Sequence, residues 1–436
     1  MSTVNRREFL RRAVAATAAV TSSGVVRAAS PNNRVVLGIM GIHDRGMDLA
    51  LEFGKRNDVE IRYLADPDSR LFDERASAVE KVNGKRPVCV QDFRRILDDG
   101  DVDALVVATP DHWHALATVL ACQAGKDVYC EKPTSHSIWE SRKMVEAARK
   151  YNRVVQVGTQ NRSAEYVEQA IEYARSAYFG DIHFVRVMNS KLRDPMSPAS
   201  DGATPDGVDY DLWLGPAPQR QFNPNHFHYS WHWFWAYGGG DLANDGVHQL
   251  DLARWVVNRE LPKAVSSAGA TYALNDTRDT PDTQTVTWEF DTVSVALEQT
   301  LWTPYMRKTP LELRDTGAVQ SWPFNGTRIE VYGTKQFLWL GHGRRMGSLR
   351  LRGQANCQST RPVCRHQYPP RGQLHRLHSF APETKRGYRG RTFFDPACAL
   401  RKHCIPFGTP PPHRRGHGGF HRRLRSERPR KTSLSC

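Results

Sequence analysis

The sequence predicts an α/β protein with two domains, the first built on a parallel sheet and the second on an open-faced, mainly antiparallel sheet with helices. Three observations predict it. Buried strands alternate with helices up to about residue 157, short alternating strands follow up to residue 340, and the composition then changes to a basic tail. We therefore expect an N-terminal leader over residues 1–30, a first domain over 31–157, a second domain over 158–340 and a disordered tail over 341–436.

One strand–helix–strand unit, residues 104–133, anchors the first domain. Residues 104–108 are apolar throughout, which is typical of a strand buried on both faces. Pro110 ends this strand, a helix follows as far as Gly125, and a second short strand leads into Glu131-Lys132-Pro133. Parallel strands end at the same edge of a sheet, where ligands of such sheets bind. One crevice should therefore be lined by Thr109, His112, His114, Glu131 and Lys132.

A glycine turn opens the same domain. Residues 34–41 have the pattern of a buried strand, and the turn Gly41-Ile-His-Asp-Arg-Gly46 follows it. This turn resembles the dinucleotide fingerprint G-x-G-x-x-G, except that His43 stands in place of the middle glycine. That histidine must swing away from the turn or itself reach a phosphate. Asp66 follows the next strand at the spacing of an acidic residue that binds ribose hydroxyls and repels a 2′-phosphate. The alternative interpretation of Asp66 is a turn or helix-cap residue. Together these features predict a nucleotide site that favours NAD over NADP.

The remaining elements of the first domain continue the alternation. Ser137 and Glu140 form a capping box in front of an amphipathic helix over 138–151. We also expect helices over 46–53, 69–81 and 93–97, and strands over 60–65, 88–90 and 154–157.

The second half of the chain has a different pattern. A helix over 164–177 and a strand over 182–188 precede an irregular stretch rich in Pro, Asp and Gly, residues 190–225. An open sheet face exposes apolar surface, so we expect a homo-oligomer to cover it. Further strands are expected over 265–272, 283–290, 293–300, 327–332 and 336–340.

Two segments of this half contain side chains that could bind a substrate or take part in acid/base catalysis. Residues 226–237 gather aromatic and histidine side chains, which either stack on the C–H faces of a sugar or pack as a buried loop. Their spacing does not predict a metal site. Residues 240–257 open a helix on which Asn244, His248 and Asp251 share one face, and an acid/base role for His248 competes with a satisfied core histidine.

These motifs resemble the Gfo/Idh/MocA family of NAD(P)-dependent oxidoreductases acting on sugars and cyclitols such as inositol. The resemblance covers about residues 34–340 and rests on the glycine turn, Asp66, Thr109-Pro110, Glu131-Lys132-Pro133 and the segment Gly246-Val-His-Gln-Leu-Asp251. It implies a Rossmann domain followed by an open-sheet domain through which subunits pair. It also implies a lysine at the nicotinamide, here Lys132, and a helix histidine in proton transfer, here His248. The family aspartate four residues before that histidine is Asn244 here, with Asp245 next to it.

The resemblance and the motifs together give a set of candidate site residues and no metal. The catalytic candidates are Lys132, His248, Asn244 and Asp245. The cofactor candidates are Gly41, Ile42, His43, Arg45, Gly46, Asp66, Thr109, Pro110, His112, His114, Glu131 and Lys132. The substrate candidates are Arg162, Trp235, Tyr237, Asp245 and His248.

The N-terminus predicts export. Arg6-Arg7 is followed by Phe9-Leu10, a short alanine-rich run and a small-residue site near Ala28, an arrangement typical of a twin-arginine signal. The apolar run is too short to span a bilayer. We therefore expect a periplasmic or other extracytoplasmic location. Little free NAD is available there, so a redox-neutral glycoside hydrolase or lyase that keeps its NAD is the alternative to a net dehydrogenase.

The tail does not continue the family pattern. Residues 341–436 hold 22 of the 61 basic and 3 of the 46 acidic residues, a balance of +19, whereas the rest of the chain has −4. A basic arm for nucleic acid or an anionic surface is one interpretation, and a shifted reading frame near His342 is the preferred one, with no nucleic-acid partner expected. A truncated, inactive nucleotide-binding protein is then the third hypothesis.

Overall fold

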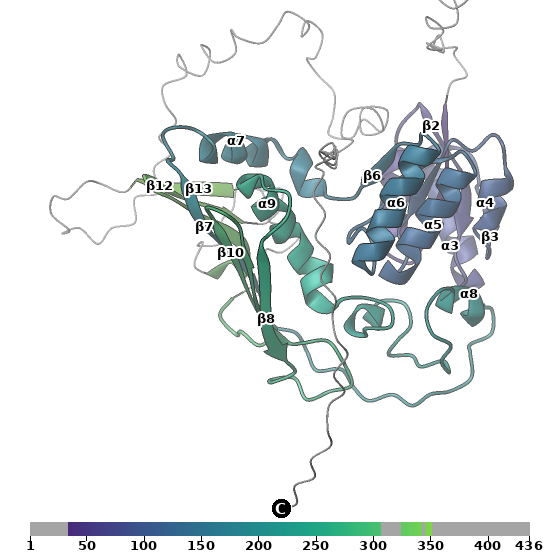
Figure 1. Ribbon diagram of the computed structural model, residues 1–436. Coiled ribbons are helices and arrows are strands. Elements are labelled where there is room, and N and C mark those ends of the chain that lie inside the picture. The colour runs from purple at the N-terminus through teal and green to yellow at the C-terminus, as the bar shows by residue number, and fades with distance from the viewer. Residues whose placement is uncertain (1–33, 307–323, 342–344, 351–436) are drawn as a thin grey trace, which may run out of the picture. The chain divides into compact units, whose positions relative to one another are not determined.

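The computed structural model describes residues 34–306, 324–341 and 345–350 (Figure 1). The leader and most of the tail lie outside these residues. The N-terminal domain is built on a six-stranded parallel sheet with the order β3-β2-β1-β4-β5-β6. Its central strands are apolar along their whole length because both faces are covered. The strands are β1 (Val35–Met40), β2 (Val59–Ala65), β3 (Val88–Val90), β4 (Ala104–Val107), β5 (Asp127–Cys130) and β6 (Val155–Val157).

Helices pack on both faces of this sheet, and each face has its own apolar cluster. One cluster joins the sheet to α5 and α6, which lie side by side in Figure 1, and the other joins it to α2 and α3. The predicted capping box is present, with Ser137 Oγ accepting from the Glu140 N–H and the Glu140 carboxylate accepting from the Ser137 N–H. The helices are α2 (Arg45–Gly54), α3 (Phe72–Asn83), α4 (Arg94–Asp98), α5 (Asp111–Gln123) and α6 (Ile138–Lys150).

The sheet order reverses between β1 and β4. Strand β1 pairs in parallel with β2 on one side and with β4 on the other, so the chain winds outward in both directions from this point. Ligands of such sheets bind in the crevice beyond the carboxyl ends of the strands at the reversal. The glycine turn after β1 and the Thr109-Pro110 loop after β4 meet there, and the α/β prediction for this half is confirmed.

The C-terminal domain is a seven-stranded mixed sheet with the order β13-β12-β11-β7-β10-β9-β8. Its pairs are antiparallel except for β7 and β10, which run parallel, so the mainly antiparallel prediction is confirmed. Helices α7 (Glu165–Ala174) and α9 (Val247–Val257) bury one face of the sheet. The strands are β7 (Ile182–Ser190), β8 (Ala264–Ala270), β9 (Thr283–Glu289), β10 (Ser294–Thr300), β11 (Thr327–Gly333), β12 (Gln336–Gly341) and β13 (Arg345–Arg350).

Strand β13 corrects the predicted start of the tail. We expected no strand beyond residue 340, yet Arg345–Arg350 pairs antiparallel with β12 over its whole length. The backbone hydrogen bonds offered by the edge of β12 recruit a segment whose own composition does not predict a strand. Residues 351–436 lie outside the described part of the chain, and so does the predicted disorder of the tail.

The irregular segment between β7 and α9 joins the two domains. It contains the short helix α8 (Tyr210–Leu214) and the 3-10 turn η3 (Ser230–Trp233), and its aromatic side chains form a core of their own. Backbone hydrogen bonds run from the Ser69 N–H to the Gly207 carbonyl (2.9 Å) and from the Asp209 N–H to the Pro67 carbonyl (2.9 Å). The segment is therefore fastened to the N-terminal domain just after β2.

A second connection orients α9. Arg162, in the turn η2 (Gln160–Ser163) after β6, donates two hydrogen bonds of 2.7 Å to the Asp251 carboxylate on α9. Both side chains are largely buried, and the guanidinium also lies over the Trp255 ring.

None of the helices in the described part of the chain has the length and apolar character that a membrane span requires.

We expect Arg162→Met to lower the free energy of unfolding by about 1–3 kcal/mol, because a partly buried carboxylate loses two charged hydrogen bonds. Urea denaturation followed by circular dichroism measures this change. The exposed Arg142→Met on α6 is the control and should stay within about 0.5 kcal/mol of the parent chain. Equal stability of the two variants would contradict a role for the pair in holding α9.

Candidate active site

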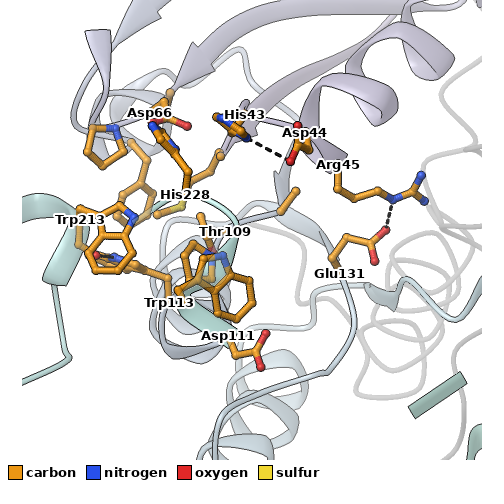
Figure 2. A pocket seen from close by; sticks show the side chains of 18 of the residues that line it. His43, Asp44, Arg45, Asp66, Thr109, Asp111, Trp113, Glu131, Trp213 and His228 are labelled. Carbon is orange, nitrogen blue, oxygen red and sulfur yellow. Dashed lines mark hydrogen bonds and ion pairs between the residues drawn. The ribbon is translucent and has the colours of Figure 1, made fainter. Parts of the chain in front are cut away.

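One cavity of about 190 Å³ lies at the carboxyl edge of the parallel sheet (Figure 2). The loops after strands β1 to β5 form one side, and the segment between β7 and α9 forms the other. The lining residues are Met40, Gly41, His43, Asp44, Arg45, Ala65, Asp66, Pro67, Gln91, Asp92, Phe93, Ala108, Thr109, Pro110, Asp111, Trp113, Glu131, Lys132, Leu212, Trp213, His228, Tyr229, Trp231 and Asn244.

The glycine turn forms one end of this cavity. Gly41 has a φ of +84°, and a Cβ there would lie 2.7 Å from the Ala108 carbonyl oxygen. A Cβ on Gly46 would lie 1.7 Å from the Gly41 carbonyl oxygen, so only glycine allows α2 to start this close to the strand end. Asp44, in front of α2, makes no side-chain cap. The turn thus leaves a helix N-terminus available to an anion such as a pyrophosphate.

His43, at the position of the absent middle glycine, swings away from the turn. Its ring stacks on His228 with the ring centroids 4.1 Å apart and the planes 21° apart. His228 comes from the second domain, has a φ of +57°, and its Nε2 lies 2.8 Å from Asp68 Oδ2. Burial lowers the pKa of His228, so the ring is neutral at neutral pH and donates to that carboxylate. Both histidines line this end of the cavity (Figure 2).

Asp66 lies beside the turn and is buried. Its Oδ2 accepts from the Ile42 N–H (2.9 Å) and its Oδ1 from the Asp68 N–H (3.0 Å). Burial outweighs these hydrogen bonds and raises the pKa of the carboxyl from 3.8 to about 6. Each oxygen keeps a second lone pair that can accept from a ribose hydroxyl.

Lys132 lies at the other end, where the two domains meet. Its Nζ donates to the backbone carbonyl of Asn244 (2.8 Å) and to that residue's Oδ1 (3.3 Å). Neighbouring Glu131 is buried and accepts from Arg45 Nε (2.9 Å), so its charge is already paired. The structure thus brings together Lys132 and Asn244, two of the residues that the sequence predicted for catalysis.

Asp111, which lines the same cavity as Lys132, is a residue that the sequence analysis missed. It is the first residue of α5 and only 2% exposed. Burial raises the pKa of its carboxyl well above the ordinary 3.8, against the opposing effect of Lys132. Its position directly after a strand end was the signal that could have identified it.

Three other candidates need correction because they are buried away from the cavity. His112 is 3% exposed and its Nε2 lies 3.1 Å from the Trp213 carbonyl oxygen. His114 is 1% exposed and holds the backbone of Pro133 and Thr109. Tyr237 is fully buried in the aromatic core. The two histidines are structural supports of the loops, and the tyrosine ring packs in the core.

Several remaining candidates lie elsewhere in the described part of the chain. Trp235 is 51% exposed and Arg162 binds Asp251, and neither lines the cavity. Asp245 forms a buried ion pair with Lys191 (2.5 Å), which also binds Asp241. His248 is half-buried on α9, four residues after Asn244, outside the cavity lining. The cavity is also lined by aromatic side chains outside the candidate set. Tyr229 and Trp231 come from the aromatic segment 226–237, whereas Phe93, Trp113 and Trp213 lie outside that segment.

Two family models match this chain. Residues 35–159 match the NAD-binding Rossmann fold of the Gfo/Idh/MocA oxidoreductase family, and residues 196–284 match the C-terminal alpha/beta domain of the same family. The chain belongs to the Gfo/Idh/MocA family. The glycine turn, with its uncapped helix and the acidic residue beside it, is the structural counterpart of the NAD-binding description.

Curated relatives share part of the chain. An uncharacterized oxidoreductase of Streptococcus pneumoniae is 30% identical over 34% of this chain and 38% of its own length. Levoglucosan dehydrogenase of Pseudarthrobacter phenanthrenivorans is 35% identical over 25% of this chain and 28% of its own length. A glycosyl hydrolase family 109 protein of Shewanella baltica is 24% identical over 34% of this chain and 38% of its own length. The chain thus matches well under half the length of these relatives.

Solved structures show the same fold. Levoglucosan dehydrogenase in complex with NADH and levoglucosan gives a TM-score of 0.53 at 22% identity, over 74% of this chain and 78% of that one. The WlbA dehydrogenase of Bordetella pertussis in complex with NADH and UDP-GlcNAcA also gives 0.53, at 20% identity over 74% of this chain and 84% of that one.

Proposed function

We propose that this protein is an NAD-dependent dehydrogenase that oxidises a carbinol carbon of a sugar or cyclitol. The observation that carries the proposal is the Lys132 ammonium, held by Asn244 at one end of a cavity whose other end is a nucleotide-binding turn. When bound, NAD supplies the hydride acceptor. Gly41, Gly46 and Asp66 would hold it, and the geometry of the turn fits the group.

The chain's own residues then have defined tasks. Lys132 hydrogen-bonds the reacting hydroxyl and moves its proton at Nζ. Trp113, Trp213 and Trp231 line the cavity, and such ring faces pack against the C–H faces of a sugar. The Trp213 carbonyl accepts from Trp113 Nε1 (3.0 Å), which holds the backbone of α8 against the start of α5 and helps to exclude water.

A panel of pyranoses, their 1,6-anhydrides and cyclitols, each incubated with NAD, tests this function. We expect NADH to accumulate with at least one neutral sugar and the purified full chain. Failure with every member of the panel, in both the oxidation and the reduction direction, would contradict it.

We expect the affinity for NAD to depend on pH through Asp66. The ionised carboxylate accepts from ribose hydroxyls, and the protonated one loses part of this capacity, so affinity should fall as the pH drops below about 6 and level off above it. Titration with NADH, followed by its fluorescence from about pH 5 to about pH 8, measures this. Asp66→Asn should flatten the dependence and weaken binding about tenfold at the higher pH. An unchanged profile in that variant would assign the pH effect to another group.

A second candidate function is redox-neutral cleavage of a glycoside with retained NAD. The similarity to glycosyl hydrolase family 109 proteins and the twin-arginine motif support it. Chromatography after incubation with an aryl glycoside separates the two functions. Free aglycone without net NADH would favour cleavage, and net NADH with intact glycoside would favour the dehydrogenase.

We further propose export by the twin-arginine route and self-association through the sheet face opposite α7 and α9. Arg6-Arg7 and the following apolar run support export. Contacts among Phe184, Tyr332 and Phe337 on that face support association. Cell fractionation with an Arg6→Lys, Arg7→Lys double variant tests the first, and light scattering of the purified chain tests the second.

A further inference from the structure

The cavity contains a carboxylate whose charge is not paired. Within the described residues that line it, the acidic side chains are Asp44, Asp66, Asp92, Asp111 and Glu131. Glu131 pairs with Arg45 and Asp92 with Arg94. Asp66 accepts two backbone N–H groups, and Asp44 is 64% exposed next to His43. Asp111 has no ion pair with a described residue, and its Oδ1 is buried without a hydrogen-bond partner.

The second domain seals Asp111 from water. The N–H of Gly239 contacts the carboxyl, and a Cβ on Gly238 would lie 3.2 Å from Asp111 Oδ2. The missing side chain of Gly238 and the N–H of Gly239 therefore let the backbone close directly over the carboxyl. A helix N-terminus favours an acidic residue electrostatically, but that effect does not account for an oxygen buried without a donor.

The partners of Lys132 show what the site lacks. Its Nζ donates to a carbonyl and an amide oxygen of Asn244, and neither can take up a proton near neutral pH. Oxidation of a carbinol releases one proton, which needs an acceptor inside the closed site. Asp111 lines the same cavity and interacts electrostatically with Lys132.

We propose that Asp111 is the proton acceptor that acts through Lys132. The inference rests on the proposed dehydrogenase. No ion pair joins the two groups in this structure, so the Lys132 side chain first turns from Asn244 toward Asp111 and gives one proton to its carboxylate. The neutral amine then takes the proton of the carbinol as the O–H bond breaks. The electron pair of the C–H bond leaves with the hydride, which NAD⁺ accepts, and a C=O bond forms. Lys132 is an ammonium before and after the step, and Asp111 ends as a neutral acid.

The charged groups that face Asp111 set the direction of its pH dependence. Lys132 lowers the pKa of the Asp111 carboxyl, whereas Glu140 at the start of α6 raises it. The buried Cys130 thiol also interacts with Asp111 and is neutral, because burial raises its pKa. The ionised carboxylate is the acceptor, so kcat/KM should rise with pH through the Asp111 pKa.

The variant Asp111→Asn keeps the shape of the side chain and removes its basicity. We expect kcat/KM at neutral pH to fall about 10²–10³-fold and the acidic limb of its pH profile to disappear. NADH affinity, measured by fluorescence, should stay within about twofold. Asp73→Asn, 96% exposed on α3, is the matched control and should behave as the parent chain. A parent-like rate and acidic limb in Asp111→Asn would overturn the proposal.

A readout without turnover separates this proposal from the proposed function. Infrared difference spectra between low and high pH should show one buried carboxyl that is missing in Asp111→Asn. In Lys132→Met its protonation midpoint should shift to higher pH, because a neighbouring positive charge is lost. An unshifted midpoint would overturn the electrostatic coupling with Lys132. If Lys132→Met shows the shifted midpoint but the parent chain oxidises no sugar, the result would instead contradict the proposed dehydrogenase activity.

Discussion

Lys132→Met is expected to lower kcat/KM for sugar oxidation by about 10³-fold while NADH binding changes little, because the variant loses the group that moves the hydroxyl proton. The Nζ contacts Asn244 and not the glycine turn, so its removal leaves the nucleotide end of the cavity intact. Steady-state kinetics and NADH fluorescence on the same preparations measure the two effects.

Lys132→Arg distinguishes proton transfer from simple charge. Arginine keeps the positive charge and does not lose its proton in proteins, so we expect it to be as inactive as methionine. The exposed Lys81→Met on α3 serves as the control and should keep full activity. Near-parental activity in Lys132→Arg would mean that the ammonium only orients the hydroxyl.

The nucleotide-binding half was the more predictable part of the fold and site. Its strands are continuous apolar runs, such as the one that became β4, and their ends locate the crevice without any long-range information. The parallel pairing of β7 with β10 was not predictable in the same way. The direction of such a pair depends on contacts between segments about a hundred residues apart. Strand β13 likewise forms by pairing with an edge and has no pattern of its own.

The substrate side was harder to predict, for a reason visible in two segments. In residues 226–237 the rings alternate between core and cavity according to a short 3-10 turn, so Trp231 lines the cavity while Tyr237 is buried. In the sequence, Asp111 only follows the proline that ends a strand. Its burial depends on Gly238 and Gly239, more than a hundred residues later in the chain, and no local spacing contains that contact.

Gly46→Ala is expected to abolish measurable NAD binding, weakening it at least about 100-fold. The added Cβ would lie 1.7 Å from the Gly41 carbonyl oxygen and 3.2 Å from the Ala108 Cβ. Because backbone surrounds it on the side of Gly41, the start of α2 must move away from the strand end, and overpacking of this kind costs about 1–3 kcal/mol or more. The N–H groups of the helix then no longer face the pyrophosphate. NADH fluorescence titration measures the loss of affinity, and urea denaturation measures the cost in stability.

Gly100→Ala provides the comparison, since a Cβ there has no neighbour within 4 Å. It removes the same backbone freedom at an open position, so we expect unchanged NADH affinity and stability within about 0.5 kcal/mol or slightly higher. Full NADH affinity in Gly46→Ala would show that the pyrophosphate binds elsewhere. The anion site assigned to the turn between Gly41 and Gly46 would then be only a packing feature of the sheet. His43 and Arg45, which also line the cavity, would become the groups to test for phosphate contact.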